Sequence, residues 1–484
     1  MPFETLLLYD ARAPLLFTGG QFLFWFSLFY VGFLTLGLRQ GARITYLLLF
    51  SWFFYYKCGG VFVILLSITT LADFEIAKRI ERASTERRRK AWLVLALSSS
   101  AGLLLYFKYT NFFVGSVVRL LGAKFELWDI ALPAGISFYT FQSLSYVVDV
   151  YRRELAASRN LREYALYLAY FPQIVAGPIV RAEDLLRELR REPALDQARL
   201  GSGLFMVLLG LVKKAIVADY LARFTDQVFS GGVGLSGFEL LLGVYGYAFQ
   251  IYCDFSGYSD IAVGLGRLTG VELPENFRAP YAAASITEFW RRWHVTLSSW
   301  LRDYVYIPLG GNRRGTARML ANLLATMALG GLWHGARATF VVWGVAHGLL
   351  LCAEKLLEAP LRRAVQGSRL ARALGALVTF QLVALLWIPF RASDLPQSAQ
   401  LLLRIVSDFQ LFDAGAVLRA RVGWLAMLAF AALLSVTPGT RSEQLARAFS
   451  RAPVWARAAL LVAVVQTTLE FRDVDVQPFI YFQF

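Results

Sequence analysis

Residues 319–352 read MLANLLATMALGGLWHGARATFVVWGVAHGLLLC and contain two long apolar blocks, Met319–Trp333 and Phe340–Cys352. No Asp or Glu occurs between Asp303 and Glu354. A helix needs about 20 mainly apolar residues to cross about 30 Å of hydrocarbon, and neutral flanks bring several such blocks to that length. The stretch therefore predicts membrane helices rather than the half-polar helices of a soluble domain.

Apolar blocks recur along the whole chain of 484 residues, of which 57% are hydrophobic and 17% charged. About 25% of the residues of an ordinary soluble domain are charged, so this chain has too few charges to cover a large globule. The other clear blocks are Phe22–Leu38, Val61–Ala72, Ala91–Phe107, Leu204–Val212, Leu235–Ile251, Ala373–Pro389, Val422–Val436 and Val454–Leu469. We predict an all-α polytopic membrane protein with roughly 10–12 transmembrane helices.

The polar stretches between these blocks are short, and none is long enough to bury a core of its own. Residues 1–484 are therefore predicted to form a single membrane domain. Its core motifs lie in residues 164–350, and additional helices follow in residues 373–484.

The formal net charge of +15 is concentrated in loops. Basic residues crowd the segments 78–90, 152–162 and 181–199 between apolar blocks. Cytoplasmic loops collect Lys and Arg, so all three are predicted to lie inside the cell. The N-terminus is then periplasmic, if Thr45–Ala72 makes two passes that are broken at Lys57–Gly60. Because the basic residues are scattered rather than gathered on one soluble face, we expect contact with lipid and no nucleic-acid binding.

The three cysteines, Cys58, Cys253 and Cys352, are far apart and lie within or beside apolar blocks. No Cys-x-x-Cys spacing occurs, so neither a disulfide framework nor a zinc site is predicted, and we expect no metal. We interpret these cysteines as small buried hydrophobic residues.

Two stretches depart from the simple helical pattern. Residues 164–180 read YALYLAYFPQIVAGPIV, an apolar run cut by Pro172, Gly177 and Pro178, which fits a kinked span and a re-entrant segment equally well. Residues 286–311 place three tryptophans on one helical stripe opposite charged residues. That pattern predicts an amphipathic helix lying in the headgroup region.

The three histidines of the chain are His294, His334 and His347. His334 follows a Gly-Gly-Leu-Trp run in the stretch without carboxylates, where burial would keep its imidazole neutral and able to act as a general base. A structural histidine inside a helix bundle fits its position equally well. His294, at the edge of the aromatic stripe, is more often interfacial than catalytic, and His347 is interpreted as structural.

Two carboxylates, Asp254 and Asp260, lie in the largely apolar run YGYAFQIYCDFSGYSDIAVGLG. An ionisable group at membrane depth needs a partner, and Arg267, Arg278 and Arg291 are the candidates. Buried ion pairing is the favoured interpretation, and orienting a histidine is the functional alternative.

The run from Phe171 to Gly348 resembles the membrane-bound O-acyltransferase superfamily, and most of all its bacterial branch typified by the membrane subunit of alginate O-acetyltransferase. The similarity rests on Phe171–Ile179 (FPQIVAGPI), Asp254–Asp260 (DFSGYSD), Pro274–Phe277 (PENF), Phe289–His294 (FWRRWH), Ile307–Asn312 (IPLGGN), Gly330–Gly335 (GGLWHG) and Phe479–Phe484 (FIYFQF). So many ordered blocks over nearly the whole chain make the resemblance specific.

The resemblance implies that His334 is the catalytic residue and that His294 is a second active-site residue. It also implies re-entrant and interfacial helices around a central tunnel, in which donor and acceptor meet from opposite sides of a bacterial inner membrane. Acetyl-CoA or another acyl thioester would be the donor substrate, with no bound cofactor. A polysaccharide acceptor and a periplasmic partner acetyltransferase would complete the system.

Alternatives concern the substrate and the reaction. The same chemistry could serve D-alanyl transfer to teichoic acid, or acetylation of peptidoglycan or cellulose. Broken helices and buried carboxylates also suit a transporter that moves an acyl group without transferring it.

Overall fold

The computed structural model describes residues 6–471 except 38, 194, 358–367, 411 and 413. These residues form helices and connecting turns with no strand among them, which confirms the all-α prediction. The motif Phe479–Phe484 lies outside the described residues. The chain divides into two compact units, one of residues 1–207 and 261–274, the other of residues 208–260 and 275–484. The single membrane domain predicted for residues 1–484 stays a prediction.

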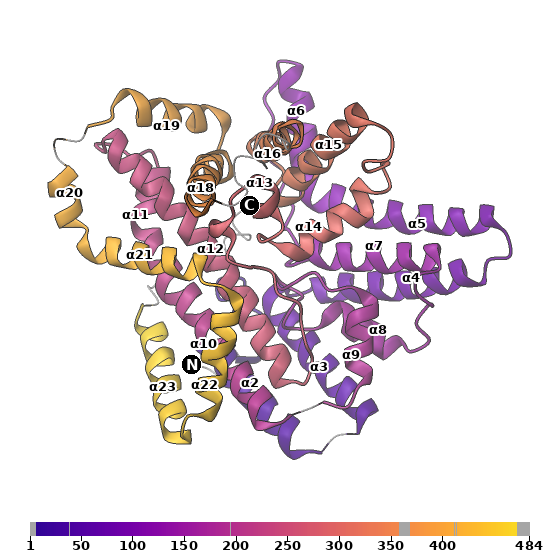
Figure 1. Ribbon diagram of the computed structural model, residues 1–484. Coiled ribbons are helices and arrows are strands. Elements are labelled where there is room, and N and C mark those ends of the chain that lie inside the picture. Colours follow the sequence, from indigo (N-terminus) through magenta and orange to yellow (C-terminus); the bar gives the residue numbers. More distant parts are fainter. Residues whose placement is uncertain are drawn as a thin grey trace. The chain divides into compact units, whose positions relative to one another are not determined.

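The first unit is built from helices of the N-terminal half, three of which, α4, α5 and α7, run side by side (Figure 1). Its elements are α2 (Gly20–Thr35), α3 (Gln40–Gly59), α4 (Phe62–Arg82), α5 (Glu86–Leu104), η1 (Leu105–Tyr109), α6 (Thr110–Leu120), α7 (Ile136–Arg152), α8 (Leu161–Ala169), α9 (Ala182–Arg190) and the start of α10 (Gln197–Leu211). Helix α3 ends at Gly59, and Gly60 adopts φ +58, so the chain is broken at the place assumed for the two passes of Thr45–Ala72. The two passes themselves stay a prediction.

The segment after α8 is a buried stretch without regular helix. Residues 171–177 form successive turns, and Phe171, Ile174 and Ala176 are all fully buried. The side-chain amide of Gln173 donates a 2.7 Å hydrogen bond to the carbonyl of Tyr167, which supports the irregular backbone from within. Of the two interpretations of residues 164–180, an ordinary kinked span is therefore wrong, because this backbone leaves the helix altogether.

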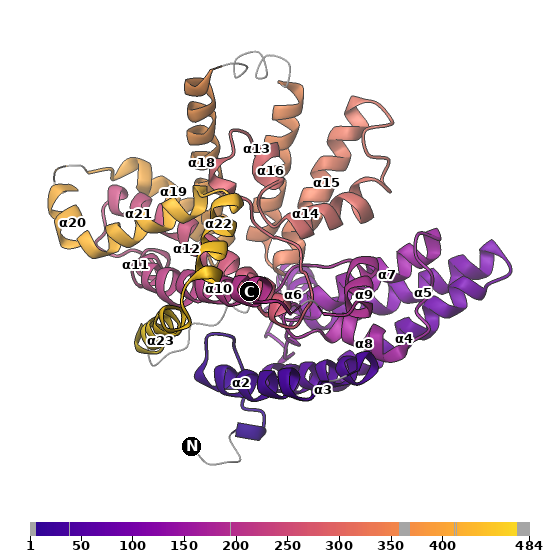
Figure 2. The ribbon, with the colours of Figure 1, turned by 60° about the horizontal axis from the view of Figure 1, so that its bottom comes forward.

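The second unit comprises residues 208–260 and 275–484. Its elements are η2 (Val212–Ala218), α11 (Asp219–Phe229), most of α12 (Gly237–Leu268), η3 (Pro280–Ala282), α13 (Ile286–Trp290), α14 (Val295–Leu301), η4 (Arg302–Tyr306), α15 (Thr316–His334), α16 (Ala338–Leu356), α18 (Arg369–Arg391), α19 (Leu395–Ser407), α20 (Ala414–Ala420), α21 (Val422–Val436), α22 (Gly439–Arg451) and α23 (Val454–Phe471). Figure 2 shows α15, α16 and α18 standing beside one another.

The tightest helix pair of this unit is α15 with α16. A Cβ atom on Gly331 would lie 2.2 Å from the carbonyl oxygen of Phe340 and 3.1 Å from Cα of Gly344. A Cβ atom on Gly344 would in turn lie 2.3 Å from the carbonyl oxygen of Met327. Only glycine allows two backbones to approach so closely, which is how membrane helices commonly pack.

Five helices of the described chain are long and apolar enough to cross a bilayer, or six if the bent pair α20–α21 is one span. The five are Glu86–Leu120, Gln197–Phe229, Ala338–Leu356, Arg369–Arg391 and Val454–Phe471. Fewer helices qualify than the roughly ten to twelve predicted, in part because apolar helices such as α2, with 16 residues, are too short. Helix α18 shows the membrane character directly: Leu374 and Val378 are 53% and 57% exposed, while Val383 on its other side is fully buried. A helix that is apolar on every face belongs in lipid.

The continuous amphipathic helix predicted for residues 286–311 is wrong. His294 has φ +42 and ψ 55, so the backbone turns there and separates α13 from α14. An α-helix cannot pass through a left-handed residue of this kind. Trp293 and Trp300 of the predicted aromatic stripe are 1% and 6% exposed, and thus face the protein core rather than a membrane surface.

Candidate active site

His334 is the last residue of α15 and sits in a ring of aromatic side chains. Its imidazole contacts the rings of Trp333, Trp343 and Phe390 at centroid distances of 5.0, 5.2 and 5.3 Å, all at steep angles. The helix ends here because Gly335 adopts an extended conformation, and the ring of Phe340 packs against it. His334 remains 4% exposed, whereas His294 and His347 are completely buried.

His294 is the residue directly before α14, and its backbone is left-handed. The backbone next to it is held by the segment before α13, because Val295 N–H donates a 3.0 Å hydrogen bond to the carbonyl of Asn276. Phe255 contacts its imidazole edge-on at 4.6 Å. A non-glycine residue at positive φ is strained, and such strain clusters at functional sites.

The charge state of His294 follows from its surroundings. Burial lowers the pKa of His294 from 6.5 to about 3, because the imidazolium would lose its hydration. Its two ring nitrogens have no hydrogen-bond partner among the described residues. The imidazole is therefore neutral near pH 7, with one N–H group able to donate and one nitrogen able to accept.

The two predicted site residues belong to one aromatic cluster. Trp333 contacts both, with centroid distances of 6.1 Å to His294 and 5.0 Å to His334. The tertiary structure thus brings together two histidines that are 40 positions apart in the sequence. Their roles stay a prediction, while their proximity is a fact of the fold.

His347 extends the same cluster on its other side. It contacts Trp343 at 4.9 Å and Trp290 at 5.1 Å, and its ring lies parallel to Phe289. Within the described chain its ring nitrogens have no hydrogen-bond partner, and neither do the indole N–H groups of Trp290 and Trp343. The cluster therefore contains buried N–H groups next to the two site histidines that could donate hydrogen bonds to a substrate. The structural role predicted for His347 stays a prediction.

The two carboxylates of α12 are ion-paired, as the favoured interpretation predicted, but the expected arginine partners are wrong. Asp254 lies 2.6 Å from Nζ of Lys214, and Asp260 lies 2.6 Å from Nζ of Lys213. Arg267 pairs instead with Glu272, and Arg278 pairs with Glu275; each partner is close by in the sequence. Sequence reasoning missed the lysines, although their signal was two adjacent cations directly after the apolar block Leu204–Val212.

Comparison with known proteins decides the family. The sequence profile of the membrane-bound O-acyltransferase family matches residues 17–392. The chain belongs to this family. It is therefore an O-acyltransferase with several membrane helices, as predicted.

Alignments with known relatives extend over most of this acyltransferase. It is 37% identical to the probable alginate O-acetylase AlgI of Pseudomonas putida over 497 positions, which cover 97% of this chain and 100% of that protein. The probable alginate O-acetylase AlgI of Pseudomonas aeruginosa is 42% identical over 79% of this chain and 73% of its own. The peptidoglycan O-acetyltransferase of Helicobacter pylori is 34% identical over 78% of each chain.

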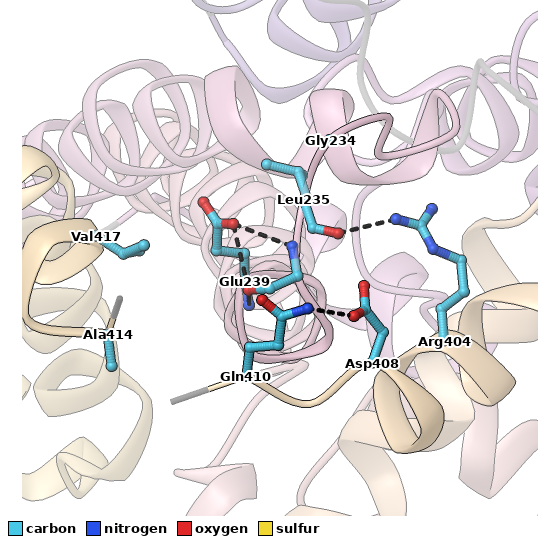
Figure 3. Close-up of a pocket in the computed structure, with 9 residues that line it drawn as sticks. Gly234, Leu235, Glu239, Arg404, Asp408, Gln410, Ala414 and Val417 are labelled. Atoms are coloured by element: carbon cyan, nitrogen blue, oxygen red, sulfur yellow. Dashed lines mark hydrogen bonds between the residues drawn. The ribbon is translucent and has the colours of Figure 1, made fainter. Parts of the chain in front are cut away.

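A separate hollow of about 360 Å³ opens elsewhere in the second unit of the acyltransferase (Figure 3). Its polar lining includes Glu239, Arg404, Asp408 and Gln410, and none of the three histidines. The guanidinium of Arg404 donates to the carbonyls of residues 231, 232 and 235 at 2.9–3.0 Å. Arg404 thus closes the loop between α11 and α12, and this hollow is distinct from the histidine cluster.

Proposed function

We propose that this acyltransferase takes an acetyl group from a cytoplasmic thioester, such as acetyl-CoA, for O-acetylation of an exopolysaccharide such as alginate. The support is the name probable alginate O-acetylase, which is carried by a relative that aligns with 97% of this chain and by another that aligns with 79%. The histidine cluster in a membrane protein supports the acyl transfer itself. An inner-membrane location with a periplasmic N-terminus belongs to the same proposal. So does transfer of the acetyl group to a polysaccharide hydroxyl, directly or through a periplasmic partner acetyltransferase.

In the proposed reaction His334 is the general base. Its neutral imidazole takes the proton of the acceptor hydroxyl while the hydroxyl oxygen attacks the carbonyl carbon of the thioester. The carbon–sulfur bond then breaks, the protonated His334 returns the proton to the leaving sulfur, and an ester and a thiol result. Atoms and charges balance without any further reactant.

His294 orients or polarises the donor carbonyl in this mechanism. A neutral imidazole can donate one N–H bond to a carbonyl oxygen, and charge develops on that oxygen as the hydroxyl attacks. The unpartnered indole N–H of Trp343, beside His334, is a second donor of the required kind. Donors that are already in place in a dry site stabilise such charge strongly.

The test uses purified protein in lipid vesicles with acetyl-labelled thioester outside and a hydroxyl-bearing acceptor inside. A general base contributes about 10²–10⁴-fold to a rate, so His334→Ala should lower acetyl transfer by that factor without loss of folded protein. His347→Gln, at the third buried histidine, is the matched control and should stay within a few-fold of the native rate. Native transfer by folded His334→Ala would refute the assignment.

The peptidoglycan O-acetyltransferase relative makes a cell-wall acceptor the second candidate. Alginate oligomers and peptidoglycan fragments offered in the same assay distinguish the two by which one becomes labelled. A transporter without acyl transfer would instead deliver label to the vesicle interior and leave the thioester bond of the recovered compound intact.

A further inference from the structure

Five charged side chains are gathered where η2 meets α12, and three of them belong to a helix apolar enough to cross a membrane. Lys213 and Lys214 lie in η2, within the span Gln197–Phe229, and are 7% and 5% exposed. Lys214 also reaches Asp219 at 2.9 Å, in addition to its 2.6 Å contact with Asp254. Buried ions in such a span are costly, and they mark function more often than stability.

The two principal ion pairs flank a point of backbone contact. A Cβ atom on Gly257 would lie 2.8 Å from the carbonyl oxygen of Gly210 and 2.8 Å from the amide nitrogen of Lys214. Asp254 precedes Gly257 by three residues and Asp260 follows it by three. The helix α12 is therefore held at three successive points along one face, so it can neither rotate nor slide without breaking an ion pair.

The opposite face of the same helix supports His294. At about 100° per residue, Phe255 and Ser259 point about 180° away from the mean direction of Asp254, Gly257 and Asp260. The ring of Phe255 contacts the imidazole of His294 at 4.6 Å.

Ser259 acts on His294 through Asn276. Its hydroxyl accepts a 3.2 Å hydrogen bond from the side-chain amide of Asn276. Asn276 in turn accepts bonds from the Val295 amide at 3.0 Å and from the Thr296 hydroxyl at 2.6 Å. The residues that follow His294 are thus tied to the α12 face that carries Phe255.

We propose that the lysine–aspartate pairs Lys213–Asp260 and Lys214–Asp254 are positioning residues for His294. They hold α12 in one rotation and at one depth, so that Phe255 and Asn276 keep the imidazole of His294 oriented in its strained backbone conformation. Both lysines lie in η2, a π-helical segment of seven residues, and such segments inside α-helices recur at functional sites. This inference rests on the proposed function, since it assigns His294 to acetyl transfer.

The test is a double-mutant cycle on kcat for acetyl transfer in vesicles. Asp254→Asn removes the carboxylate charge at constant volume and leaves Lys214 unable to fix the helix. Displacement of a catalytic group by about 1 Å can cost about 10²-fold, so we expect a kcat decrease of that order with an unchanged KM for the thioester. In a His294→Gln background the same substitution should have no further effect, because the group it positions is already gone.

Asp226→Asn is the control, because it removes a carboxylate from another ion pair of the same unit, with Arg391 at 3.1 Å. This variant should leave kcat within a few-fold in both backgrounds. Equal losses from Asp254→Asn in both backgrounds would overturn the proposal, since a merely structural pair lowers activity regardless of His294. Native activity of folded Asp254→Asn would overturn it as well.

A second measurement keeps the proposal testable without enzymatic activity. Carbethoxylation of each histidine in the purified protein is followed by mass spectrometry, and Asp254→Asn should accelerate modification of His294 but not of His347. Equal acceleration at both histidines, or none, would contradict a positioning role. If Asp254→Asn does not fold, Lys214→Met combined with Asp254→Leu and Asp219→Asn removes the lysine together with both of its carboxylate partners and should show the same selective effect.

The outcomes separate this proposal from the function on which it rests. Loss of acetyl transfer in His334→Ala with additive effects of Asp254→Asn and His294→Gln would retain the enzyme and reject the positioning role. Native transfer in His334→Ala would reject the proposed function, while selective carbethoxylation of His294 would still show that the ion pairs hold it.

Discussion

Gly331→Ala perturbs the closest backbone approach beside the histidine cluster. The added Cβ would lie 2.2 Å from the carbonyl oxygen of Phe340. Carbon and oxygen normally approach to about 3.3 Å, so α15 and α16 must separate by about 1 Å to admit the methyl group. That displacement acts three residues before His334, which is in the same helix.

Two consequences follow from this separation. Overpacking a tight contact costs about 1–3 kcal/mol, so the free energy of unfolding should fall by that amount. A misplacement of about 1 Å at a catalytic group can cost about 10²-fold, so kcat for acetyl transfer should fall by that factor. Thermal unfolding in detergent measures the first effect, and labelled-acetyl transfer in vesicles measures the second.

Gly330→Ala is the matched control, since it adds the same methyl group one position earlier. Its Cβ would lie 3.1 Å from Cδ1 of Leu301, the far end of a flexible side chain that can move aside. Because this side chain can give way, we expect less than about 1 kcal/mol of destabilisation and kcat within a few-fold of native. Equal kcat values for Gly331→Ala and Gly330→Ala would refute the argument from helix separation.

Two further predictions concern His294 and Arg404. Burial lowers the pKa of His294 from 6.5 to about 3, so between these two pH values the unfolded chain binds a proton that the folded chain does not. The free energy of unfolding therefore falls as the pH drops from 6.5 toward 3. His294→Gln should remove about 1.4 kcal/mol of this loss per pH unit, as measured by unfolding at pH 4–6, and an unchanged pH dependence would contradict the buried neutral imidazole. Arg404→Ala deletes three hydrogen bonds to carbonyls and should speed proteolysis of the loop at residues 230–236, with little change in acetyl transfer. An unchanged cleavage rate would show that Arg404 does not hold this loop.

Much of the fold could be predicted because apolar length is a local property. The blocks Ala373–Pro389 and Val454–Leu469 became the helices α18 and α23, and the glycines at residues 59–60 ended a helix where predicted. The prediction failed over residues 286–311, where the aromatic stripe has helical spacing but the backbone turns at His294. Burial of Trp293 in the core offsets the backbone strain at His294. The local sequence pattern does not show that such a tertiary contact will form.

The site could be predicted in part. The scarcity of histidine and the run before His334 singled out that residue, and the resemblance to a family added His294. The contact of both with Trp333, and the lysine partners of Asp254 and Asp260, could not be predicted. Each of these contacts depends on which helix faces pack against each other. Helical periodicity predicts which residues share a face of one helix, but it does not predict which other helix that face contacts.

The amino-acid sequence by itself determined that this protein is helical, lies in a membrane and belongs to the O-acyltransferases, because apolar length and ordered motifs are written along the chain. Only the tertiary structure decided that a left-handed backbone holds His294, that Trp333 joins it to His334, and that α12 stands between buried ion pairs and this histidine. The physical reason is that orientation and ion pairing in a low-dielectric interior are set by atoms distant in sequence, whose approach the local pattern does not encode.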